Sequence, residues 1–186
     1  EGLRPETIIK TGSPMKEILD YYKPKIMSSN ILEKLNLKTN DYFIVSAHRE
    51  ENIDNEINFL NLADSLNEIS SHFKKRIIVS THPRTKKKID TLKMKDFDSK
   101  IEFLKPMGLF DYVKLQMESY CVISDSGTIT EESSILQFPA ITIRQAHERP
   151  EGMDEGTLIM SGLAKNSIID SINLVVEHAK EGSKIV

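Results

Sequence analysis

The chemistry-bearing feature of this chain is the segment Ser124-Asp125-Ser126-Gly127-Thr128, which follows an apolar run of strand character. Thr128 and Glu131 match the S/T-x-x-E pattern that caps a helix. A helix N-terminus offers backbone N–H groups and the positive end of the helix dipole, both of which attract an anion. Gly127 has no side chain, so phosphate can approach the backbone there. The segment predicts a strand, a phosphate-facing turn and a helix whose N-cap is Ser126 or Thr128.

Polar residues also follow the other strands that we predict. These loops contain His48-Arg49-Glu50-Glu51-Asn52, His82-Pro83-Arg84, Lys105-Pro106-Met107-Gly108 and Arg144-Gln145-Ala146-His147-Glu148-Arg149. Ligands of open α/β sheets bind beyond the carboxyl ends of the strands, so these loops together predict an anionic, hydroxyl-rich ligand. His48, beside Arg49, favours an anion-binding or acid/base role. For His82, a role in shaping the turn before Pro83 remains an equal alternative.

The elements that must position these loops are short β-branched runs that alternate with helical patterns, which is typical of a parallel sheet covered by helices. The helix after the second strand is the clearest, because its apolar residues recur at helical spacing, and Asp54 is its expected N-cap. A further helix is expected after Ser167, with Asp170 completing a capping box. The fold class predicted is α/β, a Rossmann-like doubly wound parallel sheet. The predicted strands are Thr7–Lys10, Tyr42–Ser46, Arg76–Ser80, Ile101–Leu104, Tyr120–Ser124 and Ala140–Ile143, and the helix stripe is Phe59, Leu62, Leu66, Ile69 and Phe73.

Composition limits the class of protein. The chain has 186 residues, 39% of them hydrophobic and 28% charged, which is enough for one domain with a full core. A net charge of −3 argues against a nucleic-acid surface. The sequence has no apolar run long enough for a membrane span, so neither nucleic acid nor membrane is expected as a partner. The single cysteine, Cys121, lies in an apolar strand, where we expect an inert thiol, and it favours a cytoplasmic location.

Several alternative chemistries lack their motifs. The chain contains neither G-x-G-x-x-G nor a Walker loop, which disfavours dinucleotide and P-loop sites. Ser126 is a poor candidate nucleophile, because the nucleophile elbow needs glycine two residues before the serine. The spacing of zinc sites is also missing, so we expect neither a metal nor a cofactor. His72 and His178 fall late in amphipathic helices and are expected to face solvent.

Taken together, these motifs resemble the non-hydrolysing UDP-N-acetylglucosamine 2-epimerases. The residues that carry the resemblance, in this order along the chain, are Ser46-Ala47-His48-Arg49-Glu50-Glu51-Asn52, Ser124-Asp125-Ser126-Gly127, Glu131-Glu132 and Glu148-Arg149-Pro150-Glu151. The resemblance implies two Rossmann-like domains in the glycosyltransferase-B arrangement, with the active site between them. This chain resembles the C-terminal half, with residues 1–14 as the interdomain segment and first strand, and 15–186 as the UDP-binding domain. We therefore expect a fragment that lacks its N-terminal domain.

The resemblance also implies a mechanism and a set of site residues. Enzymes of this family eliminate UDP to give a 2-acetamidoglucal and then add it back, which inverts C2. By this likeness, His48 and Arg149 would stabilise the diphosphate, with His48 as the catalytic residue. The remaining carried-over UDP contacts are Ser126, Gly127 and Thr128 at phosphate, Glu132 at the ribose, and Met107 and Tyr112 at uracil. Arg49 and His82 would lie near a regulatory sugar nucleotide.

The expected function is thus the UDP-binding domain of a UDP-sugar 2-epimerase for surface polysaccharide biosynthesis, inactive when isolated. The segment from Gln145 to Asp154 resembles a capsule and O-antigen subgroup on the route to UDP-N-acetyl-L-fucosamine. The expected partners are the UDP-sugar, the missing N-terminal domain and, at full length, a second copy in a homodimer. Two alternatives remain open, a donor-binding domain of a glycosyltransferase and a nucleotide-sugar-binding module without chemistry.

Overall fold

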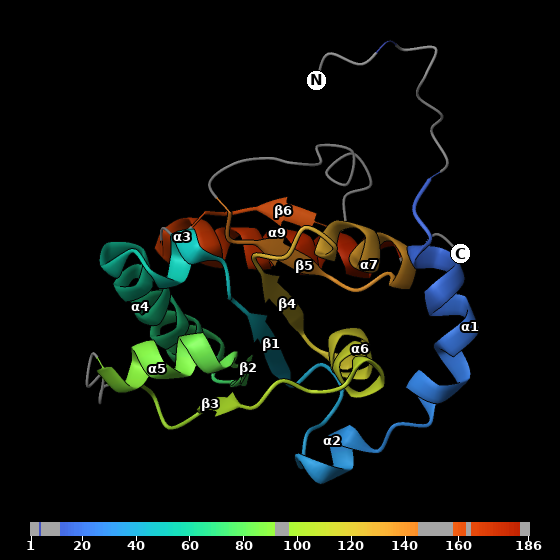
Figure 1. Cartoon of the computed structure of the whole chain (residues 1–186), viewed down its shortest axis with the longest axis horizontal. Helices are drawn as coiled ribbons and strands as arrows, with labels where there is room; N and C mark the ends of the chain where they lie inside the picture. The colour runs from blue at the N-terminus through green and yellow to red at the C-terminus, as the bar shows by residue number, and fades with distance from the viewer. Residues whose placement is uncertain (1–3, 5–11, 92–96, 145–157, 163–164, 183–186) are drawn as a thin grey trace.

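The fold is built on a six-stranded parallel sheet with the strand order β3-β2-β1-β4-β5-β6. The computed structural model describes residues 4, 12–91, 97–144, 158–162 and 165–182 (Figure 1). The predicted strand Thr7–Lys10 lies outside this range. The strands are β1 (Tyr42–Ser46), β2 (Arg76–Ser80), β3 (Ile101–Leu104), β4 (Cys121–Ser124), β5 (Ala140–Thr142) and β6 (Leu158–Met160).

This strand order confirms the doubly wound prediction. The chain adds β2 and β3 on one side of β1, then returns to place β4 on its other side and adds β5 and β6 outward. The point of reversal lies between β1 and β4, and such switch points are where open α/β sheets bind ligands. β1, β2 and β3 have the predicted bounds, whereas β4 begins one residue late, at Cys121, and β5 ends one residue early, at Thr142. β6 was not predicted; it is a short edge strand with partly exposed residues.

Both faces of the sheet are buried, as the apolar runs in its strands require. In β1, Phe43 and Val45 enter one core cluster, while Tyr42 and Ile44 enter the cluster on the opposite face. Cys121 is fully buried in β4, and burial raises the pKa of its thiol well above the ordinary value, which agrees with an inert core residue.

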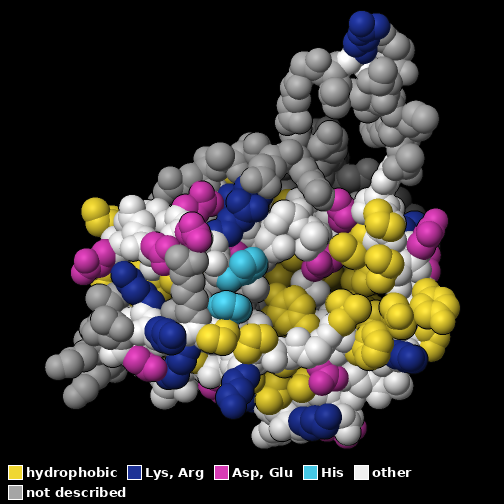
Figure 2. Space-filling view, in the orientation of Figure 1, with side chains coloured by type: hydrophobic (Ala, Val, Ile, Leu, Met, Phe, Trp, Pro, Cys, Tyr) yellow, Lys and Arg dark blue, Asp and Glu magenta, His cyan; other side chains and the backbone are white. Residues whose placement is uncertain are grey.

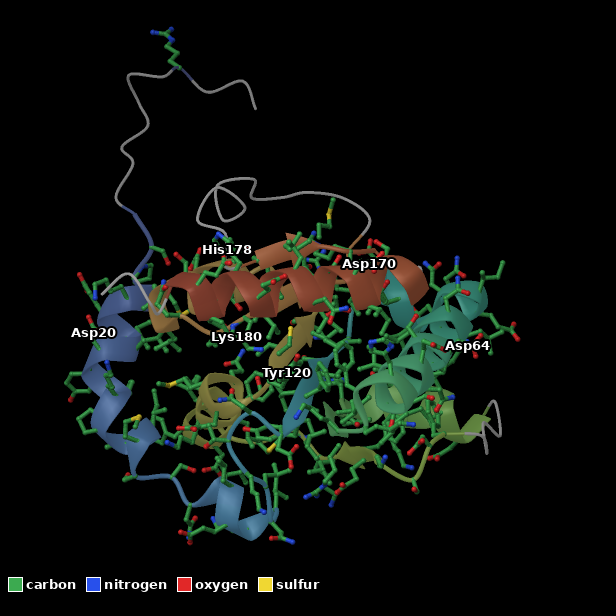
Figure 3. All side chains as sticks on the ribbon, turned by 180° about the vertical axis from the view of Figure 1, so that it is seen from behind. Asp20, Asp64, Tyr120, Asp170, His178 and Lys180 are labelled. Carbon is green, nitrogen blue, oxygen red and sulfur yellow. The ribbon has the colours of Figure 1, made fainter. Side chains whose placement is uncertain are left out.

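Helices cover the two faces (Figure 1). One face is covered by α4 (Glu56–Phe73), α5 (Pro83–Thr91) and α9 (Lys165–Gly182), and the other by α2 (Ile31–Lys34), α6 (Leu109–Glu118) and α7 (Ile129–Leu136). α1 (Met15–Met27) packs against α6, and α3 (Glu50–Ile53) precedes α4. In Figure 3, α9 crosses the back of the sheet, with Asp170, His178 and Lys180 along it. Within the described ranges, no helix has the length and apolar character needed to cross a membrane.

The helix predictions hold in their buried faces but not at their ends. The predicted stripe of α4 is buried from Phe59 to Ile69, with Phe73 packed at its edge. Its N-cap is Asn55, whose side chain accepts the Asn58 N–H at 3.1 Å, and not Asp54. Asp54 instead ends the short helix α3, which the sequence pattern did not reveal.

The C-terminal helix also begins earlier than predicted. α9 starts at Lys165, so Ser167 lies inside its first turn, where its hydroxyl donates to the Ser161 carbonyl at 2.8 Å. The capping box with Asp170 is therefore wrong. His72 and His178 are exposed near the ends of α4 and α9, as predicted.

Tyr42 links β1 to α6 and provides a test of this packing. Its side chain is fully buried and its hydroxyl donates to the Leu115 carbonyl at 2.7 Å. Burial raises its pKa, so the donor proton is retained. We expect Tyr42→Phe to lower the free energy of unfolding by about 1–3 kcal/mol, because the buried carbonyl loses its donor. Urea denaturation would measure the loss. The control is Tyr21→Phe, at a side chain 77% exposed, and equal losses in both variants would contradict this assignment.

Candidate active site

The carboxyl ends of β1 and β4 meet at the centre of the sheet. Ser46 is paired in register with Ser124, so the loops that follow these two residues lie side by side. The first loop carries His48 and Arg49, and the second leads through Asp125 into α7. The structure therefore brings together two of the polar segments predicted from the sequence, the loop with His48 and Arg49 and the Ser124–Thr128 segment. This meeting is a consequence of parallel pairing, because all the carboxyl ends then share one edge.

Asp125 joins these two loops. Its side chain is fully buried, and its Oδ2 atom accepts the backbone N–H groups of His48 and Arg49, each at 2.9 Å. The Asn52 side chain donates to the same oxygen at 3.1 Å. Burying a carboxylate is costly unless hydrogen bonds replace its water shell, and three N–H donors do so here. Asp125 thereby sets the path of the β1–α3 loop.

The two basic side chains of that loop also meet Asp125. His48 Nδ1 lies 3.2 Å from Asp125 Oδ1, with about half of the His48 side chain exposed. Arg49 Nε donates to the backbone carbonyl of Asp125 at 2.8 Å. From the sequence, Asp125 was recognised only as part of a motif. The available signal was a charged residue directly after a buried strand, because burial of a charge is costly unless hydrogen bonds compensate for it.

The turn after Asp125 is organised by hydroxyl groups. The Ser126 N–H donates to Ser124 Oγ at 3.1 Å, and the Thr128 N–H donates to Ser126 Oγ at 3.3 Å. The hydroxyls of Ser126 and Thr128 are 3.0 Å apart. Gly127 lies between them, half-buried, just before α7 begins at Ile129. Two hydroxyls and a helix N-terminus thus gather in one turn, an arrangement suited to an anion.

The predicted capping box of α7 is wrong. Thr128 does precede the helix, but its φ of −77° and ψ of −14° are helical, and its side chain makes no capping hydrogen bond. A capping side chain reaches the next turn from an extended backbone, which Thr128 does not have. Glu131 instead accepts a hydrogen bond from Ser13 Oγ at 2.6 Å. Ser126 serves the turn itself by accepting the Thr128 N–H.

Glu132, on the first turn of α7, is held by a buried glutamine. Gln116 on α6 is 1% exposed, and its Nε2 donates to Glu132 Oε2 at 2.7 Å. This bond fixes the orientation of the Glu132 carboxylate from the α6 side. Gln116 was not among the residues singled out from the sequence. The signal for it was a polar residue on the otherwise apolar buried face of α6, beside Val113 and Leu115.

Tyr112 and Met107 form another side of this region. The Tyr112 hydroxyl hydrogen bonds to the Ser46 side chain, and burial raises its pKa, with Glu132 and Asp125 adding to the effect. The hydroxyl therefore stays protonated and supports the end of β1. Met107 precedes α6, and both side chains pack as partly buried residues against the cluster that contains Ile44.

The two remaining predicted site residues are His82 and Arg149. His82 is exposed and precedes α5, where its carbonyl accepts the Lys86 N–H. It follows β2, the neighbour of β1, and so belongs to the same edge of the sheet. Arg149 lies outside the described residues. Histidine side chains appear near the middle of the face drawn in Figure 2, with basic and acidic side chains on one side and apolar side chains on the other.

Across the part of the chain that the structure describes, no group of three or more His, Cys, Asp and Glu residues is placed to hold a metal ion. The groups that converge are instead hydroxyls, backbone N–H groups and one histidine. Such groups can bind phosphate and stabilise negative charge.

A family model, a curated protein and a solved structure similar to this chain share one description. A family model described as UDP-N-acetylglucosamine 2-epimerase matches residues 1–185. UDP-N-acetylglucosamine 2-epimerase of Methanocaldococcus jannaschii is 33% identical over 159 residues, which cover 78% of this chain and 43% of that protein. Its structure in complex with UDP-GlcNAc and UDP superposes with a TM-score of 0.83 at 30% identity, covering 94% of this chain and 49% of that one.

A structure of UDP-N-acetylglucosamine 2-epimerase from Rickettsia bellii has a TM-score of 0.82 and is 47% identical, covering 95% of this chain and 46% of that chain. An Escherichia coli heptosyltransferase, 15% identical with a TM-score of 0.56 over 75% of this chain and 46% of that one, shares the fold alone. The chain thus spans about half the length of the relatives it matches. Through the family model and these identities, the chain belongs to the UDP-N-acetylglucosamine 2-epimerase family.

Proposed function

We propose that this chain is the UDP-binding half of an enzyme that inverts C2 of UDP-N-acetylglucosamine or a related UDP-2-acetamido sugar. The observation that carries the proposal is the meeting of the His48 loop and the Ser126–Thr128 turn around the buried Asp125. This meeting lies at the switch point of a doubly wound sheet, where nucleotides bind. Membership of the family and the UDP-bound relative support the same reading.

In the proposed reaction, the C1–O bond to the β-phosphate breaks while a base removes the C2 proton. UDP leaves, a 2-acetamidoglucal remains, and re-addition delivers a proton to the other face of C2. The part of this chain is to hold the leaving group. As the bond breaks, negative charge gathers on the diphosphate, and preorganised donors there lower the barrier. The proton-transfer groups belong to the N-terminal domain that we propose precedes this chain.

Most of the proposed contacts involve residues in the described region, and their surroundings support the proposal. Ser126 and Thr128 offer hydroxyls at the N-terminus of α7, and Gly127 leaves the backbone between them accessible to phosphate. Glu132 presents a carboxylate, oriented by Gln116, that can accept the ribose hydroxyls. Tyr112 and Met107 supply the apolar surface for uracil. Arg149, outside the described residues, is proposed as a second positive charge at the diphosphate.

The wider role is also part of this proposal. We assign the enzyme to the supply of sugars for surface polysaccharides in the cytoplasm, where it works as a homodimer. Arg49 and His82 are proposed to lie near a second, regulatory sugar nucleotide. Arg49 bonds to the Asp125 carbonyl, so a ligand at Arg49 would act on the same loop that carries His48.

The isolated chain should bind UDP weakly and should not epimerise UDP-N-acetylglucosamine. The reason is that the phosphate-binding turn is present, whereas the proposed proton-transfer carboxylates lie in the other domain. Calorimetry with UDP and an NMR assay for inversion at C2 would measure the two properties. Turnover by this chain alone would contradict the divided site, and failure to bind UDP would contradict the proposed function.

Glu132→Ala should weaken the binding of UDP more than that of pyrophosphate. Charge-assisted hydrogen bonds are each worth roughly 1.5–3 kcal/mol. The Glu132 carboxylate can accept such bonds from the ribose hydroxyls of UDP, whereas pyrophosphate has no ribose. The matched control is Glu131→Ala, which removes the same charge from the same helical turn but a side chain that faces Ser13. Calorimetric titration of both ligands would compare the variants. Equal losses of UDP and pyrophosphate affinity would show that Glu132 does not contact the ribose.

His48→Ala, in the complete two-domain enzyme, should lower kcat and kcat/KM together with little change in KM. Loss of one donor that acts mainly in the transition state costs on the order of 10²–10³ in rate. Steady-state kinetics on protein checked for folding would measure the effect. A kcat within about threefold of the unmodified enzyme would remove His48 from the reaction, judged against that expected loss.

A further inference from the structure

The contacts of Asp125 divide between its two carboxylate oxygens. Oδ2 is occupied by three N–H donors, from the backbone of His48 and Arg49 and from the Asn52 side chain. Oδ1 is buried and makes no hydrogen bond to any described residue, although His48 Nδ1 lies 3.2 Å away. One oxygen therefore holds the loop, while the other faces the imidazole ring.

A buried carboxylate oxygen without a donor is costly, and His48 is placed to remove that cost. The His48 backbone is anchored by Oδ2, and about half of its side chain is exposed, so a small rotation of the ring would direct Nδ1–H at Oδ1. The hydrogen bond made by one ring nitrogen decides which nitrogen carries the proton. With Nδ1 engaged by Asp125, Nε2 is the nitrogen left for a ligand.

We propose that Asp125 is a positioning residue that keeps the proton on His48 Nδ1 and aims Nε2 at the departing diphosphate. The geometry of the pair stands without any assumption about the reaction, and only the role of Nε2 rests on the proposed function. When Nε2 also carries a proton, the ring presents an N–H donor to the leaving oxygen, and Asp125 balances the positive charge of the ring. Asp125 acts through His48 and touches neither the sugar nor the phosphate.

Asp125→Asn separates this role from the role in holding the loop. Three N–H donors converge on the Oδ2 position, so the amide oxygen of asparagine must sit there. The amide NH₂ then takes the Oδ1 position and presents a donor to His48 Nδ1. A donor there favours a bare Nδ1 and a proton on Nε2. The loop is retained, while the tautomer of His48 is reversed.

The test is ¹⁵N NMR of the full chain labelled at histidine, recorded at a pH at which the rings are neutral. Protonated and bare ring nitrogens have well-separated ¹⁵N shifts, and the exposed His72 and His178 provide internal references. We expect the proton on Nδ1 of His48 in the unmodified chain and on Nε2 in Asp125→Asn. A proton on Nε2 in the unmodified chain would overturn the proposal, whether or not the variant folds.

Asn52→Ala is the matched control for the loop. It removes one donor from Oδ2 and leaves Oδ1 facing His48. We expect this variant to lose stability but to keep the proton on Nδ1. If Asn52→Ala reverses the tautomer as fully as Asp125→Asn does, loop position alone explains the effect, and a specific role of Oδ1 is excluded.

Kinetics of the complete enzyme add an independent measure. Asp125→Asn should lower kcat by about 10-fold or more, up to the 10²–10³ expected for His48→Ala. In the His48→Ala background it should add little, because a residue that acts through His48 has nothing left to orient. If the losses of kcat from Asp125→Asn and His48→Ala add in the double variant, the proposal is overturned. Absence of epimerase activity in the unmodified enzyme would instead overturn the proposed function and leave the NMR result to decide the tautomer.

Discussion

The hydrogen bonds of the Asp125 carboxylate join the two loops at the centre of the proposed site. Asp125 lies at the end of β4 and holds the loop after β1, a segment 77 residues earlier at His48. These bonds act together with the Arg49 Nε bond to the Asp125 carbonyl to tie the loop to the Ser126–Thr128 turn, although the helices after β1 and β4 cover different faces of the sheet. A fully buried, multiply bonded carboxylate is a rigid connection, since breaking it leaves a charge without solvent. The position of the His48 loop therefore depends on a side chain that touches no ligand in the proposed reaction.

The same design recurs around this connection. Tyr112 supports Ser46 at the end of β1, and Gln116 orients Glu132 on α7, both from α6. One helix thus carries one proposed nucleotide contact, Tyr112, and supports another, Glu132. Strand ends and helix starts hold side chains more closely than free loops do, and buried supporting groups limit their rotation further. For a step in which charge develops on a leaving group, fixed donors are effective because they need no rearrangement at that moment.

The proposed division of labour between two halves rests on what this domain contains. Its described residues supply hydroxyls, N–H groups and a histidine at the switch point, all suited to a departing diphosphate. Its relatives are about twice as long. Removal of the C2 proton needs a basic side chain placed beside the sugar ring, which we propose the other half provides. A site shared between two domains also permits closure around the substrate, which excludes water from a reactive intermediate.

The amino-acid sequence by itself determined the sheet, the doubly wound class and the loops that carry the polar residues. Local pattern suffices for these features, because burial on both faces requires apolar strands such as Phe43–Val45, and turns require polar residues. The family resemblance, read from the same motifs, was confirmed at the level of the family. Helix ends were less predictable: α4 is capped by Asn55, and α7 lacks its expected capping box.

Only the tertiary structure decided which polar groups are partners. The contacts of Asp125 with His48, of Gln116 with Glu132 and of Tyr112 with Ser46 join residues from different elements. A polar side chain has many possible partners in the sequence, and its choice depends on strand order and register, which no local preference encodes. β6 escaped prediction for a related reason, since three residues at a sheet edge gain their structure from pairing with β5. Sequence thus specified the elements and their chemistry, and long-range packing specified how that chemistry is assembled.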